Sequence, residues 1–63
     1  MTINEAYATW GIKPGDEVNL EATKNVLKIT EWEIENCFFG TGTKQDQAEA
    51  LRIIIAEEEK KHA

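Results

Sequence analysis

The chain has 63 residues, of which 41% are hydrophobic, and this length accommodates one small domain that spans residues 1–63. The hydrophobic content is that of a folded domain and argues against intrinsic disorder. Twelve acidic against seven basic residues give a net charge of −5, which disfavours nucleic-acid phosphates and anionic membranes as partners and favours basic proteins.

The chain opens with the signature of a short helix over residues 3–10. Thr2 and Glu5 have the Ser/Thr-x-x-Glu spacing of a capping box, in which each side chain bonds to the other residue's backbone N–H. The apolar residues that follow at helical spacing share one face: Ile3, Tyr7 and Trp10. Gly11 suits the left-handed residue that ends many helices, and Pro14 prevents the helix from continuing.

Residues 13–16 contain adjacent Pro and Gly, which indicates a turn, and the pattern of a β-hairpin follows them. Three apolar residues alternate with polar ones, as in a half-buried strand: Val18, Leu20 and Ala22. A two-residue loop at Lys24 and Asn25 places the apolar residues of both strands on one side. A bulge or tight turn near Thr30 then restores the period, and we expect a third extended segment that ends at Phe39.

The last third of the chain predicts a second helix. Residues 40–43, Gly-Thr-Gly-Thr, are typical of a flexible connection, and Thr43 is the expected helix cap. The apolar stripe of this helix consists of Ala48, Leu51, Ile54 and Ile55. Lys60 and Lys61 suit the negative end of the helix dipole. Together the elements predict an α+β fold: a helix, a two- or three-stranded antiparallel sheet and a helix, with both helices on one sheet face.

A long helix over residues 19–39 is the alternative for the centre of the chain. Four apolar residues would then be in helical register: Leu20, Leu27, Ile34 and Phe38. Against this helix stand six β-branched residues in or at the edge of the window and the consistent phase of the hairpin. These two observations favour the sheet.

Two glycine-containing segments resemble parts of the double-stranded RNA-binding domain: Gly40-x-Gly42 before the last helix, and Gly11-Ile-Lys-Pro14 after the first. The resemblance implies the order helix, strands, helix, and RNA binding through lysines at the start of the last helix. Those lysines are replaced here by Gln45, Asp46 and Glu49. Only Lys44 remains nearby, and phosphate binding needs several cations. Nucleic acid is therefore not the expected partner.

Three features with possible chemistry do not form a site. The segment from Gly40 to Lys44 lacks the spacing of a phosphate-binding P-loop. Cys37 lies in an apolar stretch without a neighbouring cation and is expected to be structural. With one cysteine and one histidine, His62, the chain cannot assemble an internal disulfide or a Cys/His zinc site. We expect no catalytic residue, no metal and no cofactor, and we expect that the protein is not an enzyme, because so small a domain has little room for a substrate pocket.

The acidic residues of the central segment are the best candidates for a partner surface. On a strand, alternate residues project to one side at intervals of about 6.6–6.8 Å, so the glutamates of the sequence Glu-Trp-Glu-Ile-Glu would form a row. The candidate partner-binding residues are Glu17, Glu21, Glu31, Trp32, Glu33 and Glu35. An ordinary solvated sheet face is the alternative explanation of the same pattern.

These observations predict a small acidic binding or regulatory protein that contacts a basic protein. Its size and charge are similar to those of small inhibitors encoded by phages or mobile elements, including anti-CRISPR-type proteins, and this similarity implies a nucleic-acid-binding host protein as the partner. The alternatives are a degenerate double-stranded RNA-binding domain and a structural homo-oligomeric subunit, such as a homodimer. No segment approaches the ~20 apolar residues of a membrane span and no signal peptide is evident, so we expect a cytoplasmic protein.

Overall fold

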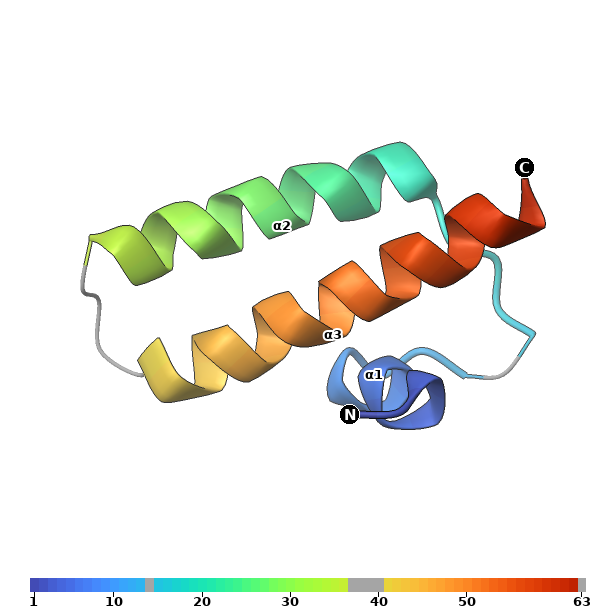
Figure 1. The fold of residues 1–63 in the computed structure, drawn as a ribbon, viewed down its shortest axis with the longest axis horizontal. Helices are drawn as coiled ribbons and strands as arrows, with labels where there is room; N and C mark the ends of the chain where they lie inside the picture. The colour runs from blue at the N-terminus through green and yellow to red at the C-terminus, as the bar shows by residue number, and fades with distance from the viewer. Residues whose placement is uncertain (14, 37–40, 63) are drawn as a thin grey trace.

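The computed structural model describes residues 1–13, 15–36 and 41–62, and it contains three helices and no strand in these ranges. The helices are α1 (Ile3–Thr9), α2 (Leu20–Glu35) and α3 (Thr41–Lys61). Figure 1 shows α3 in the middle, with α2 alongside it in the opposite direction and α1 crossing its other side. Both α1 and α2 pack against α3. The predicted α+β fold is therefore wrong, and the fold is all-α.

The structure confirms the helix predicted at the start of the chain. Glu5 N–H donates to Thr2 Oγ1 (3.2 Å), and Thr2 N–H donates to Glu5 Oε1 (3.0 Å), which completes the capping box. The Glu5 carboxylate is stabilised first by the hydrogen bond from the Thr2 backbone N–H and then by the Thr2 side chain, and both hold the pKa of Glu5 below its ordinary value. At the other end, Gly11 has φ +67°, and the N–H of Ile12 donates to the carbonyl of Tyr7 (2.9 Å), so the helix ends where the glycine predicts.

The turn between α1 and α2 is also confirmed. Asp16 N–H donates to the Lys13 carbonyl (3.0 Å), and Asp16 Oδ2 accepts from Lys13 N–H (3.0 Å). Gly15 has φ +92°, in the region that only glycine occupies readily. Pro14 lies outside the described residues.

The hairpin and third strand predicted for the central segment are replaced by α2. Asn19 caps this helix, because its Oδ1 accepts from the backbone N–H of Ala22 (2.9 Å). The supposed hairpin loop at Lys24 and Asn25 lies in the second turn of α2, and the supposed bulge at Thr30 lies in its middle. The helical alternative was the correct reading for residues 20–35, and the predicted strand end at Phe39 lies outside the described residues.

The helix α2 forms because a helical register, unlike a strand, buries a row of side chains against α3. The residues of this row are Leu20, Thr23, Leu27, Thr30 and Ile34, all buried or partly buried. Thr30 is only 4% exposed, and its hydroxyl donates to the Val26 carbonyl one turn earlier (2.9 Å). Packing of this row outweighs the weak β preference of its branched residues.

The helix α3 begins earlier than predicted and carries the core of the protein. Thr43 lies within its first turn and is not its cap. All four residues of the expected apolar stripe are buried, which confirms the stripe: Ala48, Leu51, Ile54 and Ile55. Lys60 and Lys61 occupy the last turn, as predicted. None of the helices in the described ranges is long and apolar enough to cross a membrane.

The core is small for a chain of this length. Ile54 is the largest side chain that is fully buried among the described residues, and it forms a cluster with Ala6 and Ala50. The accessible surface is 4559 Å². A folded monomer of this mass is expected to expose about 4,100 Å². The molecule is elongated, with extents of 34 × 20 × 15 Å, and leaves more surface in contact with solvent than a compact domain does.

Candidate functional site

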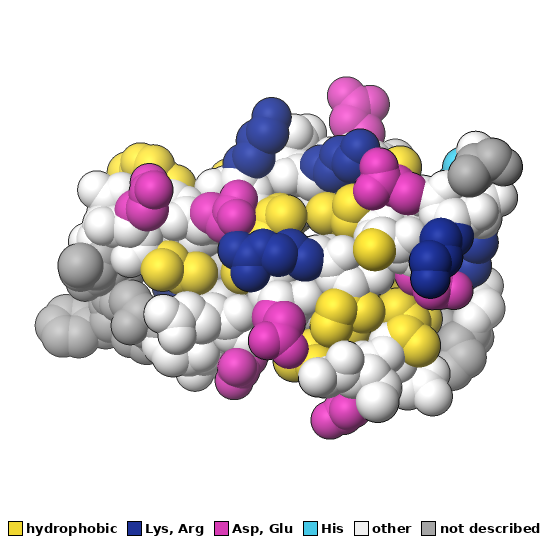
Figure 2. All heavy atoms as spheres, in the orientation of Figure 1, with side chains coloured by type: hydrophobic (Ala, Val, Ile, Leu, Met, Phe, Trp, Pro, Cys, Tyr) yellow, Lys and Arg dark blue, Asp and Glu magenta, His cyan; other side chains and the backbone are white. Residues whose placement is uncertain are grey.

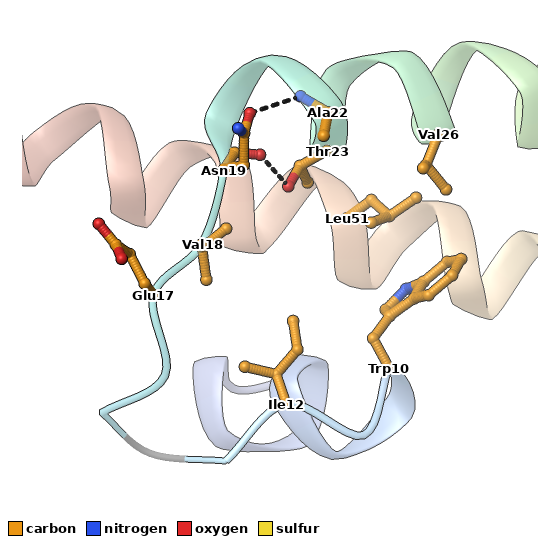
Figure 3. Close-up of a pocket in the computed structure, with 9 residues that line it drawn as sticks. All are labelled: Trp10, Ile12, Glu17, Val18, Asn19, Ala22, Thr23, Val26 and Leu51. Atoms are coloured by element: carbon orange, nitrogen blue, oxygen red, sulfur yellow. Dashed lines mark hydrogen bonds between the residues drawn. The ribbon is translucent and has the colours of Figure 1, made fainter.

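An open apolar groove lies between α1 and α2, with α3 as its floor (Figure 3). Its volume is about 250 Å³. The apolar residues that line it are Trp10, Ile12, Val18, Ala22, Val26 and Leu51. The groove exists because α1 and α2 each pack against α3 and do not pack against each other.

Local structure positions the walls of the groove. The glycine turn after α1 directs Ile12 into the hollow, and the extended segment before the Asn19 cap places Val18 opposite it (Figure 3). Trp10 is anchored, because its Nε1–H donates to the backbone carbonyl of Gln47 in α3 (3.0 Å). Glu17 lies at the edge of the groove with its carboxylate directed away from the apolar walls.

A second hollow, of about 540 Å³, lies where α2 begins and α3 ends. Its lining is more polar and consists of Glu17, Val18, Asn19, Leu20 and His62. Within the described part of the chain, no three acidic, histidine or cysteine side chains are placed to hold a metal ion. The two hollows share Glu17, Val18 and Asn19, so Glu17 lies between an apolar and a polar depression.

The predicted acidic row is absent, because the central glutamates lie on a helix. Two residues that are two positions apart in a helix are separated by a rotation of roughly 200° about the helix axis. Glu31 and Glu33 therefore lie on opposite sides of α2. Glu31 Oε2 accepts from Arg52 Nη2 (2.9 Å), and Glu33 Oε2 accepts from Lys44 Nζ (2.9 Å). These ion pairs connect both edges of α2 to α3.

The other candidate residues are dispersed. Glu17 precedes α2, and Glu21 lies in its first turn, where a carboxylate is favourable beside the positive end of the helix dipole. Glu35 is exposed in the last turn, and Trp32 is exposed on the outer side of α2. Of the six candidates, only Glu17 lines the groove.

Further ion pairs lie toward the end of α3. Lys24 of α2 approaches Glu59 (3.5 Å), and the buried Glu58 accepts from Lys61 (3.3 Å) and lies 3.7 Å from His62 Nε2. The hydrogen bond and charge of Glu58 raise the pKa of Lys61 above its ordinary value. Figure 2 shows charged side chains of both signs around the apolar residues between α2 and α3.

A second apolar surface, which sequence analysis missed, lies on the outer side of α2. It consists of Val26, Ile29 and Trp32, which are 37%, 60% and 56% exposed, and we call it the outer patch. Val26 lies at the edge that the outer patch shares with the groove. Its signal in the sequence is the spacing of three between large apolar residues, which becomes visible only when this segment is read as a helix. The groove had no comparable signal, because its residues come from α2, from α3 and from the segment that connects α1 to α2.

No protein-family model matches the chain, and searches of curated proteins and of solved structures return no significant match. The geometry of the groove and the distribution of charge are therefore the basis for a functional proposal.

Proposed function

We propose that this chain is a small acidic protein-binding module that holds the apolar side of a basic amphipathic helix in the groove between α1 and α2. The observation that carries the proposal is the open apolar groove itself, with the Glu17 carboxylate at its edge. A helix in a groove is a recurrent form of peptide recognition, in which apolar residues at helical spacing fill the hollow.

The dimensions of the groove support a protein segment as its occupant. Its volume of about 250 Å³ is below the ~300–1,000 Å³ typical of small-molecule pockets. The groove has apolar walls on both sides and an open top, which suits a row of side chains from another helix (Figure 3). This role is one of binding and needs no catalytic residue.

The charge of the molecule supports a basic partner. Four of its seven basic residues pair with glutamates of the same chain: Lys24, Lys44, Arg52 and Lys61. The net charge of −5 attracts cationic surfaces from a distance and increases the rate of encounter with them. A narrower form of the proposal is an inhibitor of a basic, nucleic-acid-binding host protein, acting in the cytoplasm.

Synthetic helical peptides test the proposal. The first probe has leucines at helical spacing with lysines on the opposite face, the second has glutamates in place of the lysines, and the third scrambles the first. The reporter is the fluorescence of Trp10 in a Trp32→Phe background, since Trp10 lines the groove. We expect saturable binding of the lysine peptide, weakened by salt, and much weaker binding of the other two. Equal binding of the lysine and glutamate peptides, or no binding of either, would refute the proposal.

A matched pair of variants locates the binding site. Ala22→Arg places a long side chain in the groove, whereas Ala56→Arg adds the same side chain to an exposed position of α3 that is not part of the groove lining. Both positions are helical and exposed, so both variants should fold. We expect at least about a tenfold loss of peptide affinity for Ala22→Arg and little change for Ala56→Arg. Similar losses in both variants would show that the peptide binds elsewhere.

A further inference from the structure

We propose that two copies of this chain associate through the outer patch of α2, which consists of Val26, Ile29 and Trp32. These residues are three of the four large hydrophobic side chains that the described part of the chain exposes. They follow one another at intervals of three and therefore lie along one side of the helix. This side is the outer side of α2, since the row led by Leu20 and Leu27 faces α3.

The small core of a single copy supports this association. Half of the six buried hydrophobic residues among those described are alanines, and Ile54 is the large side chain that is fully buried. Domains of this size usually need a disulfide, a metal or a partner subunit in addition to their core. A single cysteine cannot form an internal disulfide. The described residues hold no metal-binding cluster. A second copy supplies the missing burial.

The outer patch is suited to pairing with itself. Ile29 is at its centre, with Val26 three residues before it and Trp32 three residues after it. In an antiparallel pair with Ile29 near the two-fold axis, Val26 of each copy lies near the partner's Trp32. A two-fold interface requires such a self-complementary surface.

The area of the patch sets the expected strength of the dimer. With 16 residues, α2 has a length of about 24 Å. Two helices in contact over this length bury less than the ~1,600 Å² of a standard interface. The dimer should therefore form reversibly, and the fraction of chains in dimers should rise with protein concentration. Because each copy has a charge of −5, added salt should screen their repulsion and strengthen the dimer.

Analytical ultracentrifugation of the complete chain tests the proposal from micromolar to millimolar concentration, at low and at high salt. We expect the average mass to rise from 7.1 kDa toward twice that value as the protein concentration increases. In high salt this rise should begin at a lower protein concentration. The variants Ile29→Gln and Trp32→Gln should each weaken the dimer at least about tenfold. The control Ala56→Gln, on the exposed side of α3, should associate like the unaltered chain. Glutamine has a good helix propensity, and circular dichroism checks that each variant keeps its helices.

A mass of 7.1 kDa at every concentration and salt, or equal dimerisation of the Ile29→Gln variant, would overturn the proposal. The outcome of this dimerisation test can be distinguished from that of the peptide-binding test of the groove. Salt should strengthen self-association and weaken binding of the lysine peptide, and Ile29 does not line the groove. Loss of dimerisation with retained peptide binding in the Ile29→Gln variant would support both proposals.

Discussion

The substitution Ile54→Ala tests whether the core of this protein is centred on α3. Ile54 is 0% exposed and packs with Ala6 of α1 and Ala50 of its own helix. Partly buried side chains of α1, including Ile3 and Tyr7, surround this cluster. Removing Ile54 therefore weakens the contact that holds α1 to α3.

The cost can be worked out from the groups that are lost. Ile→Ala removes three carbon atoms, and each buried methylene contributes about 0.8 kcal/mol, which gives about 2.4 kcal/mol. The neighbouring Ala6 and Ala50 are too short to fill the space that Ile54 leaves, so the cost of a cavity adds to this value. We expect a total loss of about 3–4 kcal/mol. A chain of this length has a total stability of roughly 3–9 kcal/mol, so the loss is a large fraction of it.

Urea denaturation followed by far-ultraviolet circular dichroism measures the loss, at low micromolar concentration to keep the chain monomeric. The matched control is Ile29→Ala, which removes the same atoms from a side chain that is 60% exposed and should cost less than about 1 kcal/mol. Ile54→Val covers the case in which the alanine variant does not fold, and should cost about 0.5–1.5 kcal/mol. Equal losses for Ile29→Ala and Ile54→Ala would show that the core is not built around α3.

Three further predictions concern the helices and their ends. Thr30→Val should raise the free energy of unfolding by about 0.5–1 kcal/mol in thermal or urea denaturation, because Thr30 is 4% exposed and its hydroxyl bonds to the Val26 carbonyl of its own helix. Gly11→Ala should lower the free energy of unfolding by about 1 kcal/mol, because Gly11 has φ +67°. Gly42→Ala, in the helix α3, should raise it by about 0.5–1 kcal/mol. Effects of the same sign would contradict a left-handed Gly11 and a helical Gly42. The lowered pKa of Glu5 stabilises the fold above its ordinary value of 4.5, and this stability is lost as the pH falls through the folded pKa. Glu5→Gln should flatten that part of the pH–stability curve, and an unchanged curve would show that the bond to Thr2 N–H has no effect.

The two ends of α1 could be predicted from the sequence because their signals are local. The capping box of Thr2 and Glu5 and the left-handed Gly11 satisfy backbone groups within a few residues, so their effect does not depend on the rest of the chain. The apolar stripe of α3 was predictable because aliphatic residues mark the helical period without interruption around Ile54.

The central helix was only the alternative interpretation of the sequence, because two threonines occupy positions in its buried row. The row Leu20, Thr23, Leu27, Thr30 and Ile34 alternates spacings of three and four, the pattern of a packed helix. Thr23 and Thr30 conceal this period, since threonine is counted as polar and favours strands. The hydroxyls of both residues donate to carbonyls one turn earlier, at 2.7 Å and 2.9 Å, which permits a threonine on the side of α2 that faces α3. Only the packing of α2 against α3 reveals this arrangement.

The acidic pattern of the central segment was interpreted as a surface, whereas part of it connects two helices. Glu31 and Glu33 pair with Arg52 and Lys44, which are 21 and 11 residues away in the chain. Such pairs depend on the register of α2 against α3, which sequence alone does not specify. Once these carboxylates are engaged, a partner surface cannot be defined by acidic residues alone. Apolar area is then the stronger criterion, and the described residues offer it in two places. One is the groove beside Glu17, where the charge suits a basic helix. The other is the outer patch, where salt favours a second copy because it screens the net charge of −5 on each chain.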